Sequence, residues 1–208
     1  MASVAKFTAH AVRNQLRHNL REIVQSANAD IDTERCWQNY VLSPDRGESD
    51  YDYFKERTEN LYCYHREDVK VMAGWIVTAP KDLKVEREDD FFKATYDFLA
   101  ARYGEKNVVQ AVVHEDESGK PHLHFCFIPV VEDKKHEQGE KICANDVLNR
   151  KELRNFHGDL QRYLDESGID AQVHSGVTQE QGGSRTVAAL KEAREIERTH
   201  EIAHRLVF

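Results

Sequence analysis

Three closely spaced histidines are the first group in this sequence that could form a reactive site. His114, His122 and His124 fall within the stretch HEDESGKPHLHFCFIPVV. Residues two apart on a β-strand point to the same face, so His122 and His124 share a face. The runs VVQAVVH and HLHFCFIPVV, joined by the polar turn EDESGKP, predict a β-hairpin that brings His114 opposite that pair. Three neutral imidazoles suit zinc, manganese, iron or nickel and leave coordination positions open.

A metal site of this kind admits more than one chemistry. It can polarise a phosphoryl oxygen or activate a water molecule. A hydrolase or oxygenase acting on a small molecule and a phosphoryl transferase acting on nucleic acid are both consistent with it. Asp116 and Glu117 lie in the turn beside the histidines and are either supporting carboxylates or ordinary polar turn residues.

The elements that must position these side chains are neighbouring strands and long helices. Besides the hairpin, the patterns predict strands at 2–7, 36–42 and 69–80, and helices at 8–27, 50–67, 87–104, 144–168 and 187–208. In the first helix, Arg17 and Arg21 would lie four residues apart on one face. Regular strand–helix–strand alternation and a glycine-rich phosphate loop are both missing from the pattern. The predicted fold class is therefore α+β, a central and mainly antiparallel sheet flanked by helices.

The composition is that of a globular domain. The chain has 208 residues, of which 40% are hydrophobic and 32% charged. No apolar run reaches the roughly 18–20 residues needed to cross a bilayer, and the first residues lack the apolar block of a signal peptide. We therefore expect no membrane segment and a cytoplasmic location. The four cysteines are scattered without a CxxC pair, so a disulfide framework is not expected and most should be small buried residues.

The charge pattern leaves the choice of partner open. The net charge of −8 argues on its face against a nucleic-acid partner. Positive charge is nevertheless concentrated locally, in VRNQLRHNLR with Arg13, Arg17 and Arg21 and again between Lys134 and Arg162. A local basic patch can dominate a binding face, so net charge does not exclude DNA.

Nearly the whole chain resembles one family, in that family's order. HEDESGKPHLHF resembles the H-x-D-E…P-H-x-H signature of the Mob/Pre (MobV-type) plasmid mobilisation relaxases, a branch of the HUH endonucleases. RHNLRE resembles their HN-x-R motif, NADIDTERCWQNYVL their D-I-x-x-x-R…N-Y segment, and GGSRTVAALKE their closing segment. VMAGWIVTAPKD and the following FFKATYDFLAARYGEKNVVQAVVH resemble their central strand and helix. The turn between Glu117 and Pro121 is one residue longer than the family usually has.

This resemblance implies an HUH relaxase-like fold, with 1–208 as one relaxase domain. It implies nicking and re-joining of one strand at a plasmid or transposon origin of transfer, with Mn²⁺ or Mg²⁺ and a covalent 5′-phosphoryl–enzyme intermediate. The partner would be single-stranded origin DNA with an adjacent hairpin. Relaxases of this type usually continue into a C-terminal region, so we expect a truncated chain whose dimerisation region is missing.

The resemblance also implies roles for individual residues. Most HUH enzymes use a tyrosine nucleophile, but this family is associated with the histidine of HN-x-R, here His18. Glu117 would orient that histidine, Arg21 would steady phosphate charge, and Asp116 would support the site. His114, His122 and His124 would hold the metal, and the residues expected to contact DNA are Arg13, Arg17, Asn19 and Arg21.

Alternative functions remain open at this point. A rolling-circle replication initiator would use a tyrosine, for which Tyr40 is the rival nucleophile and Tyr51 and Tyr53 are weaker ones. A small-molecule hydrolase would form no DNA adduct. A non-catalytic DNA-binding module would tolerate loss of the three histidines.

Overall fold

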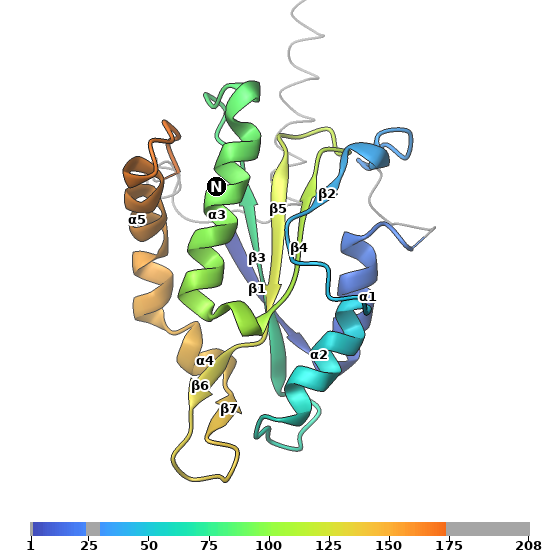
Figure 1. Ribbon diagram of the computed structural model, residues 1–208, viewed down its shortest axis with the longest axis vertical. Helices are drawn as coiled ribbons and strands as arrows, with labels where there is room; N and C mark the ends of the chain where they lie inside the picture. Colours follow the sequence, from blue (N-terminus) through green and yellow to red (C-terminus); the bar gives the residue numbers. More distant parts are fainter. Residues whose placement is uncertain (1, 24–29, 174–208) are drawn as a thin grey trace, which may run out of the picture. The chain divides into compact units, whose positions relative to one another are not determined.

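Five strands form one antiparallel sheet at the centre of the described part of the chain. The computed structural model describes residues 2–23 and 30–173. The strand order is β1-β3-β5-β4-β2, and every neighbouring pair is antiparallel. The strands are β1 Ala2–Thr8, β2 Tyr40–Val41, β3 Lys70–Thr78, β4 Val108–His114 and β5 His122–Phe127 (Figure 1). The predicted α+β class with a mainly antiparallel sheet is confirmed.

Helices cover both faces of this sheet. Helices α1 Ala9–Asn19 and α2 Asp50–Glu59 lie on one face, and α3 Glu88–Tyr103 and α5 Arg150–Glu166 lie on the other (Figure 1). Three acidic residues occupy the first turn of α3, where the helix dipole favours them, and Gly104 ends it with a φ of 88°. The remaining elements are the helix α4 Ala144–Val147, the hairpin β6 Val130–Glu132 with β7 Glu140–Ile142, and the 3-10 turns η1 Cys36–Gln38, η2 Val85–Arg87 and η3 Glu105–Asn107.

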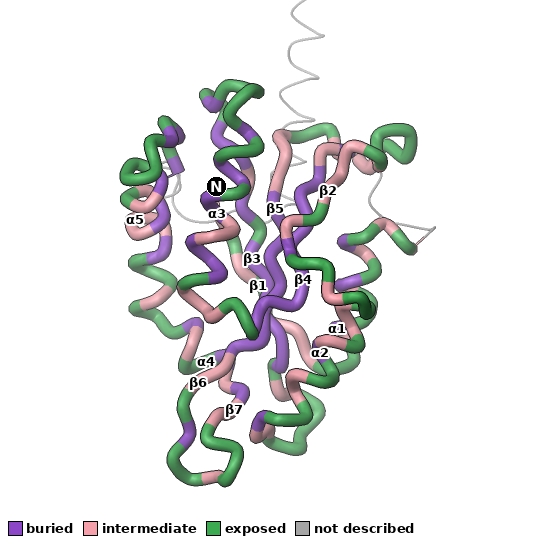
Figure 2. Tube along the Cα trace, in the orientation of Figure 1, coloured by how far each residue is buried: buried purple, intermediate pink, exposed green. Residues whose placement is uncertain are grey.

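Strand alternation divides the side chains of β5 between the two faces. Leu123, Phe125 and Phe127 belong to the core under α3 and α5. Cys126 packs on the other face with residues of α1 and α2, and His122 and His124 share that face because they lie two and four residues away. Strand β4 is buried along its whole length (Figure 2), so the sheet holds the histidines on a rigid base.

Two predicted helices end earlier than their sequence patterns suggest. The helix predicted at 8–27 stops at Asn19, and Arg21 has a left-handed φ of 58°. The prediction that Arg17 and Arg21 share a helix face is therefore wrong. The helix predicted at 50–67 ends at Glu59.

Other predicted elements are interrupted by a local turn, a proline or a capping side chain. The strand predicted at 36–42 is η1 followed by β2, and the strand at 122–131 breaks between β5 and β6 at a segment containing Pro129. The helix predicted at 144–168 is two helices, because the Asn149 side chain accepts bonds from Lys151 N and Glu152 N and starts α5. The predicted helix 187–208 lies outside the described residues.

The cysteines follow the prediction only in part. All four are free, as expected, but only Cys126 is buried, while Cys36, Cys63 and Cys143 are partly exposed. In 2–23 and 30–173, no helix is both long and apolar enough to cross a membrane.

Candidate metal and catalytic site

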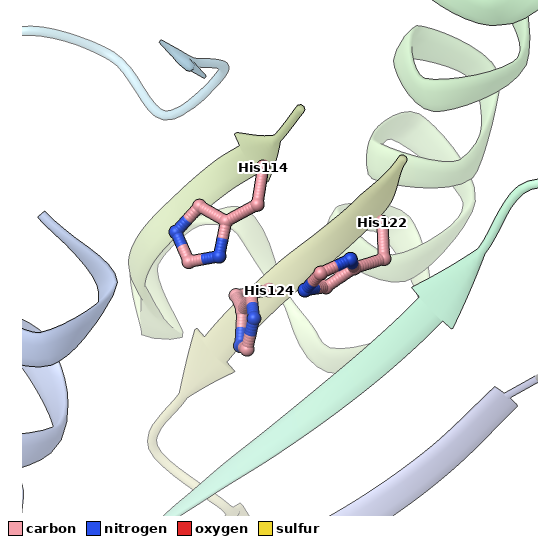
Figure 3. Close-up of side chains that lie close together, drawn as sticks. All are labelled: His114, His122 and His124. Atoms are coloured by element: carbon pink, nitrogen blue, oxygen red, sulfur yellow. The ribbon is translucent and has the colours of Figure 1, made fainter. Parts of the chain in front are cut away.

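The predicted hairpin brings the three histidines together. His114 pairs directly with His122, and His124 lies opposite Val112. The ring centroids are 5.3 Å apart for His114 and His122, 4.4 Å for His114 and His124, and 4.9 Å for His122 and His124. One nitrogen of each ring lies within 4.8 Å of the other two, and the rings converge from two adjacent strands (Figure 3).

The donor chemistry of this cluster fits a divalent metal. His124 Nε2 is buried and has no hydrogen-bond partner in the part of the chain that the structure describes. An orphaned buried nitrogen is costly unless an unseen group satisfies it. Burial is the main cause that lowers the pKa of His122 and His124, and it lowers the pKa of His114 to about 4. The three rings are thus neutral at neutral pH, which is the form that binds metals.

Hydrogen bonds fix which nitrogen of His114 is available. His114 Nε2 lies 2.7 Å from the carbonyl oxygen of Asn19 and donates to it, so Nδ1 keeps its lone pair. Arg21 Nη2 lies 3.1 Å from that Nδ1, but it also donates to Asp116 Oδ1 at 2.6 Å and Glu117 Oε1 at 2.9 Å. The two carboxylates use both hydrogens of Nη2, which leaves the Nδ1 lone pair for a metal.

Asp116 is the centre of a buried polar cluster beside the histidines. Its carboxylate accepts two bonds from Arg21, one of them from Nε at 2.7 Å, and one each from Asn39 Nδ2 at 2.7 Å and Cys36 Sγ at 3.1 Å. Burial alone would raise the pKa of Asp116, but these hydrogen bonds outweigh it and hold that pKa well below its usual range. Asp116 is therefore a fixed anion that anchors Arg21, while Glu117 is partly exposed.

His18 occupies the last turn of α1 and is half-buried. Burial and the charge of Arg21 lower the pKa of His18, against the opposing effects of Glu117 and Asp116. The lowered pKa favours the neutral form of the His18 imidazole, although the charges of Glu117 and Asp116 favour a positive ring.

The residues predicted to contact DNA divide into two sets. Arg13 and Arg17 are exposed on α1 and line a groove of about 280 Å³ between α1 and α2. Asn19 is buried: its Nδ2 donates to Gln110 Oε1 at 2.8 Å and its backbone carbonyl holds His114. The side chain of Asn19 is thus not offered at the surface. The DNA contacts of Arg13, Arg17 and Arg21 stay predictions.

Sequence reasoning missed several residues of this cluster. Asn39 and Cys36 bind Asp116, although they lie 77 and 80 residues away along the chain. Gln110 donates to Asp50 Oδ2 at 2.7 Å and connects that carboxylate to Asn19. Asn39 is the asparagine of the D-I-x-x-x-R…N-Y segment, so the motif could have indicated a role for it. Cys36 occupies no motif position, so the sequence did not indicate its role.

The fold and the site together define a class of protein. An antiparallel sheet between helices, with a histidine–hydrophobe–histidine pair on a central strand and a third histidine beside it, is the HUH arrangement. More narrowly, the chain belongs to the Mob_Pre family, described as plasmid recombination enzyme, whose model matches residues 1–186.

Curated relatives carry the same description. The plasmid recombination enzyme of Bacillus thuringiensis is 30% identical over 176 residues, covering 82% of this chain and 38% of the relative. That of Streptococcus agalactiae is 30% identical over 202 residues, covering 93% of this chain and 39% of the relative. That of Lactiplantibacillus plantarum is 28% identical, covering 83% of this chain and 48% of the relative. The chain therefore spans less than half the length of these relatives.

A solved structure shares the fold over nearly its full length. The relaxase domain of MobM, bound to plasmid pMV158 oriT DNA with manganese at pH 6.8, matches with a TM-score of 0.74 and 29% identity. The match covers 93% of this chain and 97% of that domain. A manganese-bound complex of the same domain at pH 5.5 gives the same TM-score and identity.

Proposed function

We propose that this chain is a relaxase domain that nicks and re-joins one strand at a plasmid or transposon origin of transfer, with a divalent metal. The observation that carries the proposal is the convergence of three imidazole nitrogens around the unsatisfied His124 Nε2. Membership of the Mob_Pre family and the manganese-bound oriT complex of MobM support both the DNA substrate and Mn²⁺ as the metal. An adjacent DNA hairpin and dimerisation through a region outside this chain stay predictions.

His114, His122 and His124 would hold the metal. When bound, a divalent metal there would draw electron density from a phosphate oxygen and favour attack at phosphorus. The protein's contribution is to hold three neutral rings on the sheet, so that no proton has to leave before binding.

His18 would act as the nucleophile. A nitrogen lone pair of its neutral imidazole forms a bond to phosphorus, and the bond from phosphorus to the 3′-oxygen breaks. The leaving oxygen keeps the electron pair and takes up a proton to become a free 3′-OH, while the phosphorylated ring loses the proton of its other nitrogen, so protons and charge balance. The product is a 5′-phosphoryl–histidine, and attack by the 3′-OH reverses the step when the strand is re-joined.

Charged neighbours would stabilise the change at His18 and at the phosphate. Glu117 balances the positive charge that develops on the ring during attack. Arg21 Nη1 is buried without a hydrogen-bond partner among residues 2–23 and 30–173, so it is a free donor for a phosphate oxygen. Asp116 acts through Arg21, because its bidentate bond fixes the guanidinium.

The rival nucleophile is less well placed for this chemistry. Tyr40 packs against the core under α3 and α5, on the face of the sheet opposite the histidines. Its hydroxyl donates to Asp89 Oδ1 at 3.0 Å. Burial and that bond raise the pKa of Tyr40, which makes its oxygen harder to deprotonate. These contacts favour His18 over Tyr40.

An adduct assay tests the proposal. The protein is incubated with Mn²⁺ and single-stranded oligonucleotides carrying origins of related plasmids, and covalent links are found on denaturing gels and by peptide mass spectrometry. We expect an acid-labile adduct with the wild type, with Tyr40→Phe and with the control His10→Ala, but none with His18→Ala. His10 is a suitable control because it is exposed in the first turn of the same helix.

Two results would contradict the proposal in different ways. An acid-stable adduct on Tyr40 would keep the DNA substrate but replace the nucleophile, as in a replication initiator. Metal binding without an adduct on any origin would favour a small-molecule substrate.

A further inference from the structure

Trp37 is the most exposed large hydrophobic side chain in the described part of the chain. It is 79% exposed in the 3-10 turn η1. The only other tryptophan, Trp75, is 2% exposed, stacks on Phe156 at 3.6 Å and donates to the hydroxyl of Tyr103. Tryptophan is highly buried on average, and Trp37 departs from that average more than any other large hydrophobic residue among 2–23 and 30–173.

The segment that carries Trp37 is bound to the candidate site by several independent contacts. Its immediate neighbour Cys36 and the nearby Asn39 both donate to the carboxylate of Asp116. Asp32 N donates to the backbone oxygen of Asp116 at 2.7 Å, and Arg35 Nη2 donates to the backbone oxygen of Glu115. The backbone segment that carries Trp37 is therefore fixed to the β4–β5 turn, and His114 and His122 lie at the ends of the two strands that this turn joins. Figure 1 shows the turn at one end of the sheet.

We propose that Trp37 is a stacking platform for an unpaired nucleobase of single-stranded DNA, close to the reacting nucleotide. This inference rests on the proposed relaxase function. A base presents a flat π-face whatever its identity, so an exposed indole on a fixed backbone segment binds it without hydrogen-bond readout. The ring adds affinity without positive charge, which suits a chain whose net charge is −8.

The indole should add to DNA affinity in a way that separates it from the arginines. Loss of base stacking on an aromatic ring weakens binding about 5- to 140-fold. Because no charge is removed, the dependence of affinity on salt should keep its slope, whereas loss of a phosphate contact would reduce it.

Intrinsic fluorescence measures this contact directly, because Trp75 is sealed in the core and Trp37 is the accessible emitter. The full chain is titrated with a single-stranded origin oligonucleotide in chelator, so that no cleavage occurs. We expect DNA to quench the emission and to protect it from acrylamide. Trp37→Phe should abolish the fluorescence change on DNA binding but keep most of the affinity for DNA. Trp37→Ala should bind DNA about 5- to 140-fold more weakly.

A matched control separates a local from a general effect. Tyr64 is an aromatic residue that is 53% exposed and lines a groove with Ala9 at the opposite end of α1 from His18. Tyr64→Ala should bind DNA like the wild type. Urea unfolding of Trp37→Ala should match the wild type, because the exposed ring contributes little to the core.

Three outcomes would overturn the inference. If the wild type binds DNA without a change in emission and Trp37→Ala binds equally well, Trp37 has another partner while the proposed function stands. A reduced salt slope in Trp37→Ala would indicate a lost phosphate contact instead of stacking. If the wild type binds no single-stranded DNA, the proposed function and this inference fall together.

Discussion

The two faces of the central sheet are built from the same strands but differ in the polar groups that they bury. Under α3 and α5 the sheet presents apolar and aromatic side chains, with close ring contacts such as Tyr103 on Phe127 at 4.1 Å. Under α1 and α2 there is a second apolar cluster, which includes Phe54 and Met72, but the buried groups there also include Asn19, Gln110 and His114. Each of these polar groups has a specific hydrogen-bond partner. We call the first face the apolar face and the second the polar face.

This difference separates stability from chemistry. Burial of apolar surface is non-directional and stabilises the strands as a unit. Buried polar groups add little net stability when bonded and cost much when orphaned, but they fix orientation. Packing on the apolar face therefore fixes the strands relative to one another. Because the strands are fixed, the imidazoles and carboxylates on the polar face are held in defined positions.

Adjacent residues on β5 provide the sharpest test of this comparison. Phe125→Ala should lower the free energy of unfolding by about 3–5 kcal/mol, because a fully buried ring leaves a cavity. His124→Ala, one residue away on the other face, should cost roughly 1 kcal/mol and abolish Mn²⁺ binding. Urea denaturation and titration calorimetry measure the two effects. Equal losses of stability in both variants would refute the division between the faces.

Acid should weaken the polar face selectively. Because burial lowers the pKa of His114 to about 4, the folded ring stays neutral while the unfolded ring takes up a proton below about pH 6.5. The free energy of unfolding of the metal-free protein should therefore fall between about pH 6.5 and 4, by roughly 1.4 kcal/mol per pH unit for each such ring. Urea denaturation across this range measures the slope. A flat profile would show that the histidines are not desolvated as described.

The depressed pKa of Asp116 has a consequence at lower pH. A carboxylate whose pKa is lowered by folding stabilises the protein above the unfolded pKa, near 3.8, and this contribution is lost as the pH falls further. A second drop in stability should therefore appear below about pH 4 and be absent from Asp116→Asn.

Asn39 should contribute less to stability than Phe125 but more to activity. Asn39→Ala removes a donor to Asp116 and an acceptor for the backbone N–H of Glu115. We expect the free energy of unfolding to fall by about 1–3 kcal/mol, because a buried carboxylate loses a hydrogen-bond partner. We also expect slower formation of the covalent DNA adduct. Gln38→Ala, which removes only an exposed bond to Arg35, is the control and should cost less than about 0.5 kcal/mol. Normal adduct rates in Asn39→Ala would show that Asp116 does not position Arg21.

The smallest effect is expected on the outer surface of α3. Lys93 and Asp97 form an exposed i, i+4 ion pair at 2.5 Å. Lys93→Ala should lower the free energy of unfolding by about 0.3–0.5 kcal/mol, and this loss should become smaller as salt is added. Mn²⁺ binding should be unchanged, and urea denaturation at two salt concentrations measures the effect. A loss above about 1 kcal/mol would mean that the apolar face depends on surface charge more than its packing suggests.

The histidine cluster could be predicted from sequence because it depends on local rules. The period of two along a strand and the antiparallel pairing across a short turn place His114, His122 and His124 on one face. The same reasoning predicted the strands of the sheet and the long helix α3. It failed at boundaries such as the end of α1, because the pattern of apolar residues continues past the last hydrogen-bonded turn.

Only the tertiary structure decided how the cluster is supported. The left-handed backbone at Arg21 directs its guanidinium to Asp116 and Glu117, and a helix continuing through this residue would not place it there. Asn39 reaches Asp116 from a segment 77 residues away. Such contacts have no periodicity in the sequence, since they form only when distant segments pack. The sequence by itself therefore determined which residues face the metal position, and packing determined their charge state, orientation and partners.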